Sequence, residues 1–249
     1  AARGSRLLRV RGCMDCHATD LGGSLMADDP AIGTLFAANL TTGEGGVASS
    51  YREEKDWVRS IRHGVGPDGK PLLFMPSHEF NPIGDDDLAA MIAAIRAMPA
   101  VDRAPMENRA GPVAAMLFLT GQMALLPAEL IDHEAPRPTT PQPGSTVEYG
   151  AYLATGCVGC HGMTLSGGKI PGGPPGTPEP ANITPDPETG IGRWTQADFV
   201  RVLREGIRPD GRQVDAFMPV AMTKEFTDME LEAIWKYLRT VEPKAFGNR

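Results

Sequence analysis

The chain has four cysteines, and all of them belong to two short strings in which a histidine follows directly. The strings read CMDCH and CVGCH, and their chemically useful residues are Cys13, Cys16 and His17, and Cys157, Cys160 and His161. The spacing C-x-x-C-H is typical of covalent haem attachment, because two intervening residues bring both thiols to the vinyl groups along one porphyrin edge. The adjacent histidine then ligates the iron. We therefore expect two covalently attached haem c groups, one for each string.

Three other uses of paired cysteines match this pattern less well. A zinc ribbon places its C-x-x-C pairs roughly 15–20 residues apart, whereas these pairs are 144 residues apart. A redox-active dithiol does not need a histidine after each pair, and thiols this close in sequence seldom form a structural disulfide. Because the histidine recurs at both strings, haem attachment is the favoured interpretation.

The same short motifs follow each haem string in the same order, which indicates an internal duplication. Asn-Leu-Thr begins at Asn39 and Asn-Ile-Thr at Asn182, while WVRSIR begins at Trp57 and FVRVLR at Phe199. Pro-Asp-Gly and Phe-Met-Pro then follow in both copies, with offsets of 142 to 144 residues throughout. We expect one module that occurs twice, with one haem in each copy.

Helices are expected on either side of these motifs, at 5–12, 51–63, 147–156 and 195–205. Ser50-x-x-Glu53 and Thr195-x-x-Asp198 resemble capping boxes at the starts of two of them. Thr227-x-x-Glu230 resembles a third, before the last helix. The last helix of each copy carries an apolar stripe with helical spacing that suits core packing, at Leu88, Met91, Ile92 and Ile95, and at Leu231, Ile234, Trp235 and Leu238.

Glycine and proline together make up 52 of the 249 residues, a share that predicts many turns and long loops. The fold class expected is all-α with long loops, in two tandem domains joined by a long linker. The domains are expected at 1–100 and 147–249, with the linker at 101–146.

Methionine is expected to complete the coordination of each iron. Met75 and Met218 each follow a phenylalanine and precede a proline at the same place in the repeat, and the fixed φ of proline suits a loop that presents a thioether. A methionine ligand favours ferrous iron and raises the reduction potential. Met222 is the alternative in the second copy, and His78 is the alternative in the first.

Residues of the same type at matching places in the two copies offer donors for the haem propionates. Arg62 and Arg204 can form charge-assisted hydrogen bonds to a carboxylate, and the equivalent pair Arg59 and Arg201 can do the same. Solvated arginines on the outer face of a helix are the other interpretation. Four more residues are expected to contact the haems or their loops. Trp57 and Trp194 are expected to donate hydrogen bonds, and Asn39 and Asn182 to orient the haem or its loop.

In this order the motifs resemble those of class I c-type cytochrome domains. The string NITPDPETGIG at 182–192 is similar to the haem domains of the cytochrome subunits of bacterial alcohol, aldehyde and gluconate dehydrogenases. The resemblance implies an electron carrier, periplasmic or on the outer face of the cytoplasmic membrane. It also implies His/Met ligation, by His17 with Met75 and by His161 with Met218. The redox partners implied are a dehydrogenase, an oxidase, a reaction centre or a bc1-type complex.

Charge and hydropathy exclude other partner classes. A net charge of −7 and a pI near 5.3 disfavour nucleic acid, which needs a basic footprint. No run of 18 apolar residues predicts a transmembrane span, and no signal peptide is visible at the start. Association with a membrane surface stays open because of a short arginine-rich segment, Arg3, Arg6, Arg9 and Arg11. Within the linker, the apolar stretch 113–131 is expected to pack across both haem domains, with a docking surface as the alternative.

Electron transfer is the leading functional hypothesis, and nothing in the chain need act as an acid or a base. A dihaem peroxidase is the enzymatic alternative, but it would need one iron with an open site. A dihaem thiosulfate dehydrogenase would need a further cysteine ligand, and every cysteine is already used. A haem-relay subunit fixed within a membrane complex is the third hypothesis.

Overall fold

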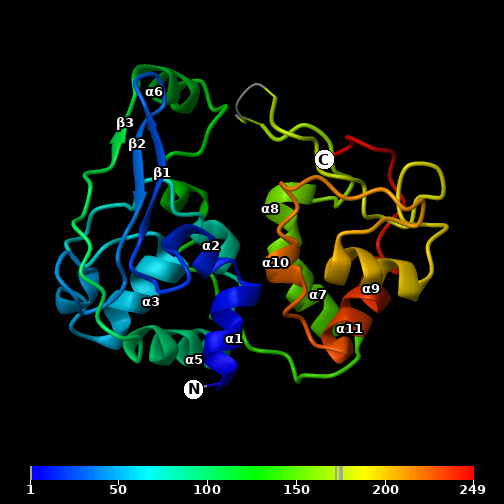
Figure 1. Cartoon of the computed structure of the whole chain (residues 1–249), viewed down its shortest axis with the longest axis horizontal. Helices are drawn as coiled ribbons and strands as arrows, with labels where there is room; N and C mark the ends of the chain where they lie inside the picture. Colours follow the sequence, from blue (N-terminus) through cyan, green and yellow to red (C-terminus); the bar gives the residue numbers. More distant parts are fainter. Residues whose placement is uncertain (1, 172, 174–175) are drawn as a thin grey trace. The chain divides into compact units, whose positions relative to one another are not determined.

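The computed structural model describes residues 2–171, 173 and 176–249, and the chain divides into two compact units (Figure 1). The first unit is Ala1–Thr140 and the second is Pro141–Arg249. The division falls within the segment that the sequence predicts as a linker, so residues 101–140 pack with the first unit. Helices are the main regular elements of both units, and long loops separate them.

In the first unit, short helices surround a core that includes Leu8, Trp57, Leu88 and Met91. The α-helices are α1 (Ala2–Val10), α2 (Cys13–His17), α3 (Glu54–His63), α4 (Ser77–Phe80), α5 (Asp85–Arg96) and α6 (Pro112–Leu119). Two 3-10 turns, η1 (Val47–Ser49) and η2 (Pro127–Leu130), lie in the loops. The first haem string therefore forms a helix of its own, α2, directly after α1.

The second unit repeats this order of elements. Its helices are α7 (Val147–Ala154), α8 (Val158–His161), α9 (Gln196–Glu205), α10 (Val220–Thr223) and α11 (Asp228–Leu238), with the 3-10 turn η3 (Thr155–Cys157) before α8. The expected helices at 147–156 and 195–205 agree with α7 and α9 to within two residues. Residues 162–171, 173 and 176–194 contain no helix or strand.

The first unit also contains a small antiparallel sheet, which the all-α prediction missed. Its strands are β1 (Ser24–Asp29), β2 (Gly33–Ala37) and β3 (Arg109–Ala110), in the order β1-β2-β3. The turn between β1 and β2 is closed by Asp29, whose carboxylate accepts hydrogen bonds from the N–H groups of Ala31 and Ile32 at 2.8 and 2.9 Å. Since β3 comes from the expected linker, local sequence patterns could not reveal this pairing.

In each unit the helix before the haem string packs closely through a glycine on the long helix that ends the repeated module, α1 on α5 and α7 on α11. A Cβ atom added at Gly4 of α1 would lie 2.0 Å from the carbonyl oxygen of Ala90 in α5. A Cβ added at Gly150 of α7 would lie 2.0 Å from the carbonyl oxygen of Ala233 in α11. The two crossings thus have the same construction, and each fixes the helix that leads into a haem string.

The predicted helix caps are confirmed in the second unit and partly wrong in the first. Thr195 with Asp198 and Thr227 with Glu230 form capping boxes at the starts of α9 and α11. The expected box at Ser50 is wrong, because Glu53 caps α3 with Asp56 as its partner. Ser50 instead ends the η1 turn, and its hydroxyl donates to the carbonyl oxygen of Val47 at 2.7 Å. The extra turn moves the start of α3 three residues along the chain.

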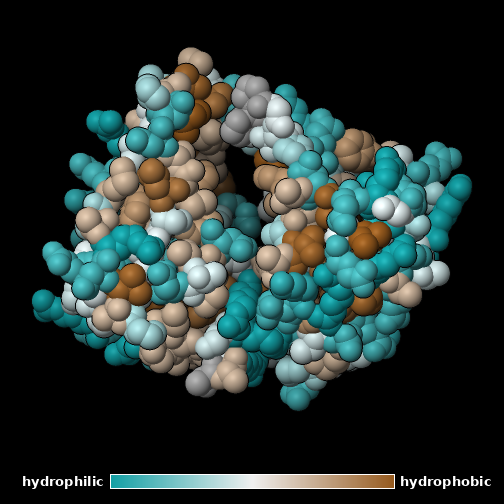
Figure 2. All heavy atoms as spheres, in the orientation of Figure 1, coloured by the Kyte–Doolittle hydropathy of each residue, from teal (hydrophilic) through white to brown (hydrophobic). Residues whose placement is uncertain are grey.

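Among the described residues, no helix has both the length and the apolar character that crossing a membrane requires. Apolar side chains do gather on the surface over α6, as Figure 2 shows. They include Val113, Met116 and Leu119, and the last of these is 82% exposed. The apolar stretch of the linker is therefore only partly used in packing.

Replacing Ala18 by glycine should stabilise the first unit by about 1 kcal/mol. Ala18 follows the haem string with φ 65° and ψ 164°, a conformation that only glycine adopts without strain. Its counterpart in the second unit is Gly162, with φ 82° and ψ 164°. Denaturant unfolding checks the prediction, and Gly162→Ala is the matched control, which should destabilise the second unit. A neutral or lower stability for Ala18→Gly would contradict it.

Candidate haem sites

The histidines of the two haem strings are held in the same way. The Nδ1–H of His17 donates to the carbonyl oxygen of Ala38 at 2.7 Å, and the Nδ1–H of His161 donates to that of Ala181 at 2.7 Å. Burial lowers the pKa of both imidazoles, which favours the neutral ring. With the proton on Nδ1, the lone pair of Nε2 is left for a metal, and the carbonyl fixes the ring orientation.

The four cysteines are half-buried and reduced. Burial is the main reason why the pKa of Cys13 is raised to about 12, and burial also raises the pKa of Cys16. Burial therefore favours the protonated form of these two thiols. In the described part of the chain, no three His, Cys, Asp or Glu side chains are grouped as a metal ion would need. The arrangement fits thiols that become thioethers better than a zinc site.

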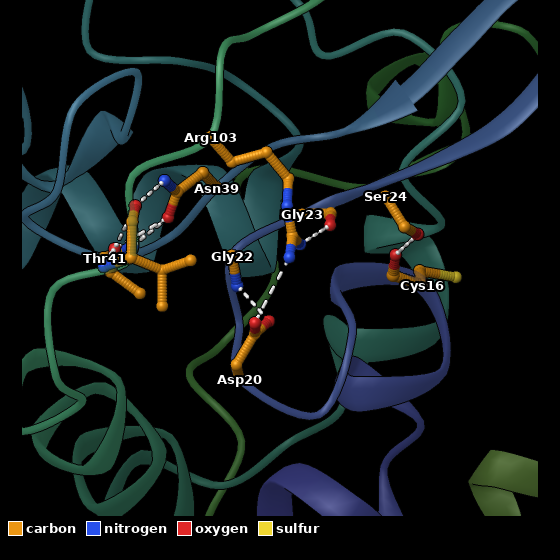
Figure 3. A network of polar contacts seen from close by, with 9 residues as sticks. Cys16, Asp20, Gly22, Gly23, Ser24, Asn39, Thr41 and Arg103 are labelled. Atoms are coloured by element: carbon orange, nitrogen blue, oxygen red, sulfur yellow. Dashed lines mark hydrogen bonds and ion pairs between the residues drawn. The ribbon is translucent and has the colours of Figure 1, made fainter.

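Asn39 and Asn182 organise the loop that carries each histidine's partner carbonyl. The side-chain oxygen of Asn39 accepts from the backbone N–H and the hydroxyl of Thr41 at 2.9 and 2.8 Å (Figure 3). Asn182 makes the same two contacts with Thr184, at 2.9 and 2.8 Å. All four of these residues are buried. Asn39 and Asn182 thus orient the loop, one of the two roles expected from the sequence.

Each Asn-x-Thr loop is tied to the segment that follows the long helix at the end of the repeated module, α5 in the first unit and α11 in the second. The side-chain nitrogen of Asn39 donates to the carbonyl oxygen of Val101 at 2.6 Å, and that of Asn182 donates to Lys244 at 2.7 Å. Further along, Arg103 binds the carbonyl of Gly23 and the carboxylate of Asp20 (Figure 3). The sequence did not predict these ties, because the carbonyl groups of Val101 and Lys244 are main-chain acceptors that any residue type supplies.

In the second unit the last residue returns to the haem string itself. The guanidinium of Arg249 donates to the carbonyl oxygens of Cys160 and Gly168 at 2.7 and 3.1 Å. A further contact joins Arg249 to the carbonyl of Gly159 at 3.3 Å. The final segment therefore supports the peptide between the two cysteines.

Replacing Thr184 by valine should destabilise the second unit by roughly 1–3 kcal/mol. The fully buried hydroxyl donates to Asn182 and accepts from the N–H of Lys244 at 3.2 Å, and valine keeps the shape but removes both bonds. Denaturant unfolding measures the change. Thr41→Val is the matching variant in the first unit, where Val101 N–H donates to Thr41 at 2.9 Å. An unchanged stability in both variants would contradict this view of the loop.

Trp57 has the properties of a donor to a buried acceptor. The side chain is 2% exposed, and its Nε1–H is buried without a hydrogen-bond partner. It lines a cavity of about 300 Å³ together with Leu40, Tyr51, Ile95 and Met98. A haem propionate would satisfy this N–H. Trp194, the other tryptophan expected to act as a donor, is half-buried in the turn before α9.

The structure gives Arg62 and Arg204 protein partners. Arg62 is buried and binds Asp85 and the carbonyl of Ile83, both at 2.7 Å. Arg204 binds Asp228 at 2.6 Å. Asp85 and Asp228 begin the last helix of each unit, so these arginines fix those helices. The Nε–H of Arg62, like the Nε1–H of Trp57, is buried without a hydrogen-bond partner. The Nε atoms of Arg59 and Arg201 are buried without partners in both units.

Met75 and Met218 occupy equivalent half-buried positions directly before α4 and α10. The following prolines both have a φ of −78° and begin those short helices. The helices are in turn anchored to α3 and α9, because Ser77 donates to the carbonyl of Ser60 at 3.0 Å and Thr223 to that of Leu203 at 2.8 Å. Both thioethers are thus presented from braced loops.

The two alternative ligands, His78 and Met222, lie three and four residues further along the chain, inside the short helices α4 and α10. His78 is half-buried in α4, its Nδ1 is buried without a hydrogen-bond partner, and burial lowers its pKa. Met222 is half-buried in α10. Both residues stay alternatives to Met75 and Met218.

The donor set fits a covalently bound haem. Each unit brings two cysteine thiols, one neutral imidazole with a fixed tautomer, and a methionine loop, and the first unit adds the unsatisfied N–H of Trp57. Cysteine, histidine and methionine are the side chains that hold haem c.

Comparison with known proteins agrees with a haem site of this kind. The family model of cytochrome c matches residues 147–242. The chain is 37% identical over 110 residues to the cytochrome c subunit of the quinone alcohol dehydrogenase of Gluconobacter oxydans, covering 41% of this chain and 23% of that protein. It is 36% identical over 115 residues to the cytochrome subunit of the fructose dehydrogenase of Gluconobacter japonicus, covering 42% and 24%.

A third relative is a diheme c-type cytochrome of Cereibacter sphaeroides, 31% identical over 101 residues, which cover 37% of this chain and 34% of that protein. The chain thus spans between 23% and 34% of the length of these three relatives. A cytochrome c domain implies covalently bound haem c with its iron. The chain therefore contains a cytochrome c domain at residues 147–242, and it is similar to the cytochrome c subunits of bacterial alcohol, fructose and gluconate dehydrogenases.

Proposed function

We propose that the chain is a dihaem electron-transfer protein, built from tandem cytochrome c domains at 1–100 and 147–249 with a linker at 101–146. The observation that carries the proposal is the repeated histidine geometry. In each unit a C-x-x-C-H histidine donates from Nδ1 to a loop carbonyl at 2.7 Å, and an Asn-x-Thr network holds that loop. The family model does not cover the first unit, but this unit has the same histidine hydrogen bond and the same Asn-x-Thr loop as the second.

The residues divide the work of holding two haem c groups. Cys13 and Cys16 attach the first, with His17 and Met75 as iron ligands, and Cys157 and Cys160 attach the second, with His161 and Met218. Trp57 donates to a propionate of the first haem. The bound irons would supply one-electron redox chemistry, which needs no acid, base or nucleophile from the chain.

Saturated coordination suits electron transfer rather than catalysis. A protein ligand on each side leaves no position for a substrate, and the packed helices around the site keep their geometry when the charge of the iron changes. The peroxidase alternative needs an open iron near an acid or base. Burial raises the pKa of Glu79, which lies four residues after Met75, so this carboxyl is the group to test if one iron proves open.

A dehydrogenase is the proposed redox partner. The relatives that are named as cytochrome subunits serve alcohol, fructose and gluconate dehydrogenases, and none of these names points to an oxidase, a reaction centre or a bc1-type complex. A location in the periplasm or on the outer face of the cytoplasmic membrane is proposed on the same basis. The net charge of −7 would steer a basic partner surface, with an association rate that falls as salt rises.

A haem count and a redox titration test the proposal. The full chain should give two c-type haems per polypeptide in a pyridine haemochrome assay, and one in the double variant Cys157→Ser/Cys160→Ser. The variant Cys13→Ser/Cys16→Ser should also retain one. The full chain should titrate in two one-electron steps and should not react with peroxide. A single haem in the full chain, or a high-spin iron that consumes peroxide, would refute the proposed function.

A further inference from the structure

The two methionine loops begin alike but differ in length by one residue. Val65 pairs with Pro71 in the first unit, and Ile207 pairs with Gln213 in the second, each as an isolated β-bridge. The next N–H groups, of Leu72 and Val214, donate to Gly64 and Gly206, both at 2.7 Å. One residue then precedes Phe-Met-Pro in the first unit, and two residues precede it in the second. The first loop must therefore cover the same path with less chain.

The shorter loop contains a strained residue that is held by the linker. Phe74 has a φ of +69°, in the left-handed region that phenylalanine adopts only under constraint. Its backbone N–H donates to the carbonyl oxygen of Leu125 at 2.8 Å. The side chain of Phe74 is 44% exposed, so packing of the ring does not impose this conformation. Two backbone bonds hold it instead: the bond to Leu125 of the linker, and a tight turn in which the N–H of Met75 donates to the carbonyl oxygen of Leu73 at 2.9 Å.

The longer loop closes on itself instead. With the extra residue, the side-chain carboxylate of Asp215 accepts a hydrogen bond from the N–H of Phe217 at 2.8 Å, and its main-chain carbonyl oxygen accepts one from the N–H of Met218 at 3.0 Å. Phe217 is also 44% exposed, but it is not among the non-glycine residues with positive φ in the described part of the chain. The second loop thus needs no support from outside its own sequence.

The supporting part of the linker, residues 125–133, forms a strap that is anchored at both ends. At its start Leu125 is 4% exposed, and Ala128 further on is 7% exposed. At its end the Nε2–H of His133 donates to the carbonyl oxygen of Ala128 at 3.0 Å. With its proton on Nε2, His133 accepts at Nδ1 from the Nδ1–H of His63, the last residue of α3, at 3.1 Å.

The second copy of the repeat has no counterpart of the histidine pair in its sequence. His63 aligns with Glu205 in the second copy, and His133 lies in the linker, which has no counterpart there. The rings of His63 and His133 have centroids 5.3 Å apart, which suits a head-to-head hydrogen bond between them. The pair therefore ties the end of the strap to the helix that also supports α4.

We infer that the strap is a positioning element for Met75, so that the sixth iron ligand of the first haem is held by the linker whereas that of the second haem is held within its own loop. This inference rests on the proposed function and adds a difference between the two haems. Leu125 and His133 are positioning residues, since they act through Phe74. Loosening the strap frees Phe74 from its left-handed conformation, and the loop then presents Met75 less firmly.

Two variants of the full-length holoprotein test the inference. Leu125→Ala weakens the buried start of the strap. His133→Ala removes the hydrogen bond between the exposed His133 and His63 without disturbing the core. Hydrogen exchange measured by mass spectrometry should show about five- to tenfold faster exchange of the peptide 70–80 in both variants, because one backbone bond is weakened. The peptide 212–222 should be unchanged. Leu119→Ala, at an 82% exposed position of the same linker, is the matched control and should change neither.

Imidazole added to the oxidised protein gives a second readout, because it competes with the methionines for iron. In the strap variants half of the spectral change should appear at about five- to tenfold lower imidazole concentration. Asp215→Ala should move the half of the spectral change that comes from the second haem to lower imidazole concentration. The triple variant with Leu125→Ala and His133→Ala should move both halves. The imidazole readout depends on the proposed methionine ligands, but the exchange readout does not.

Exchange in the peptide 70–80 that stays at the wild-type rate in both strap variants would overturn the inference. Faster exchange in both peptides together would also overturn it, because it would report general loosening. If imidazole fails to displace any methionine signal in the wild type, the ligand assignment under the proposed function is wrong, and the exchange result still decides the role of the strap.

Discussion

Replacing Met218 by alanine converts one of the two haems from low spin to high spin and removes half of the methionine–iron charge-transfer absorption. Met75→Ala has the same effect on the other half, and the double variant removes all of it. In the proposed ligation a thioether completes each iron, so alanine would leave a position that water or an added ligand fills. The reduction potential of the affected haem should also fall, because the methionine ligand favours ferrous iron. Optical spectra and a redox titration measure both changes.

The alternative ligands supply the controls for this experiment. Met222 lies four residues after Met218 in the second unit, and His78 lies three residues after Met75 in the first. Met222→Ala and His78→Ala should keep the full charge-transfer absorption and two low-spin haems. Loss of half of the absorption in Met222→Ala instead of Met218→Ala would move the ligand to Met222. In the first unit, a wild type with absorption from only one methionine would favour His78.

The chemistry of the sites was readable from the sequence because it depends on short, local strings. C-x-x-C-H fixes the thiols and the imidazole within five residues, and a repeated Phe-Met-Pro marks the methionines wherever the fold places them. Helices with strong periodicity and caps, such as α9 with Thr195 and Asp198, were also predicted to within a residue or two. Local backbone geometry decides these features, so one copy of the repeat predicts the other.

The features that the sequence did not reveal depend on residues far apart in the chain. The strand β3 lies in the linker and pairs with Gly33 and Thr34 of β2. Its two residues are too few to show an alternating pattern of their own. The contacts of Arg62 with Asp85 and with the carbonyl of Ile83 were also not expected from the sequence. Composition cannot tell a surface arginine from one that fixes a helix start. His63 and His133 are a similar case, because neither position indicates the other.

The same distinction applies to the glycines at the helix crossings. Gly4 and Gly150 stand inside helices, where glycine is about 1 kcal/mol less favourable than alanine. A helical pattern therefore treats them as weak points. The structure shows that a Cβ atom at either position would collide with the backbone of the facing helix, α5 for Gly4 and α11 for Gly150. The two glycines had a sequence signal, since both lie in the helix just before a haem string.

Gly150→Val should accordingly be strongly destabilising, with a loss of about 3 kcal/mol or more in the unfolding free energy of the second unit. A Cβ at this position would lie 2.0 Å from the carbonyl oxygen of Ala233 and 2.5 Å from its carbonyl carbon. Backbone atoms cannot rotate away, so α7 and α11 must separate and the packing between them is lost. Because α7 leads directly into the second haem string, the variant should also retain less of the second haem.

Denaturant unfolding and a haem count of Gly150→Val measure these two effects together. Gly144→Ala is the matched control, since a Cβ there meets its nearest atom at 3.6 Å, which is ordinary contact. It should leave both quantities unchanged. Gly4→Val should act on the first unit in the same way, because its Cβ would lie 2.0 Å from the carbonyl oxygen of Ala90. If Gly150→Val unfolds like the wild type and keeps both haems, the close helix crossing does not control haem retention, and the loop networks of Asn39 and Asn182 must carry that role.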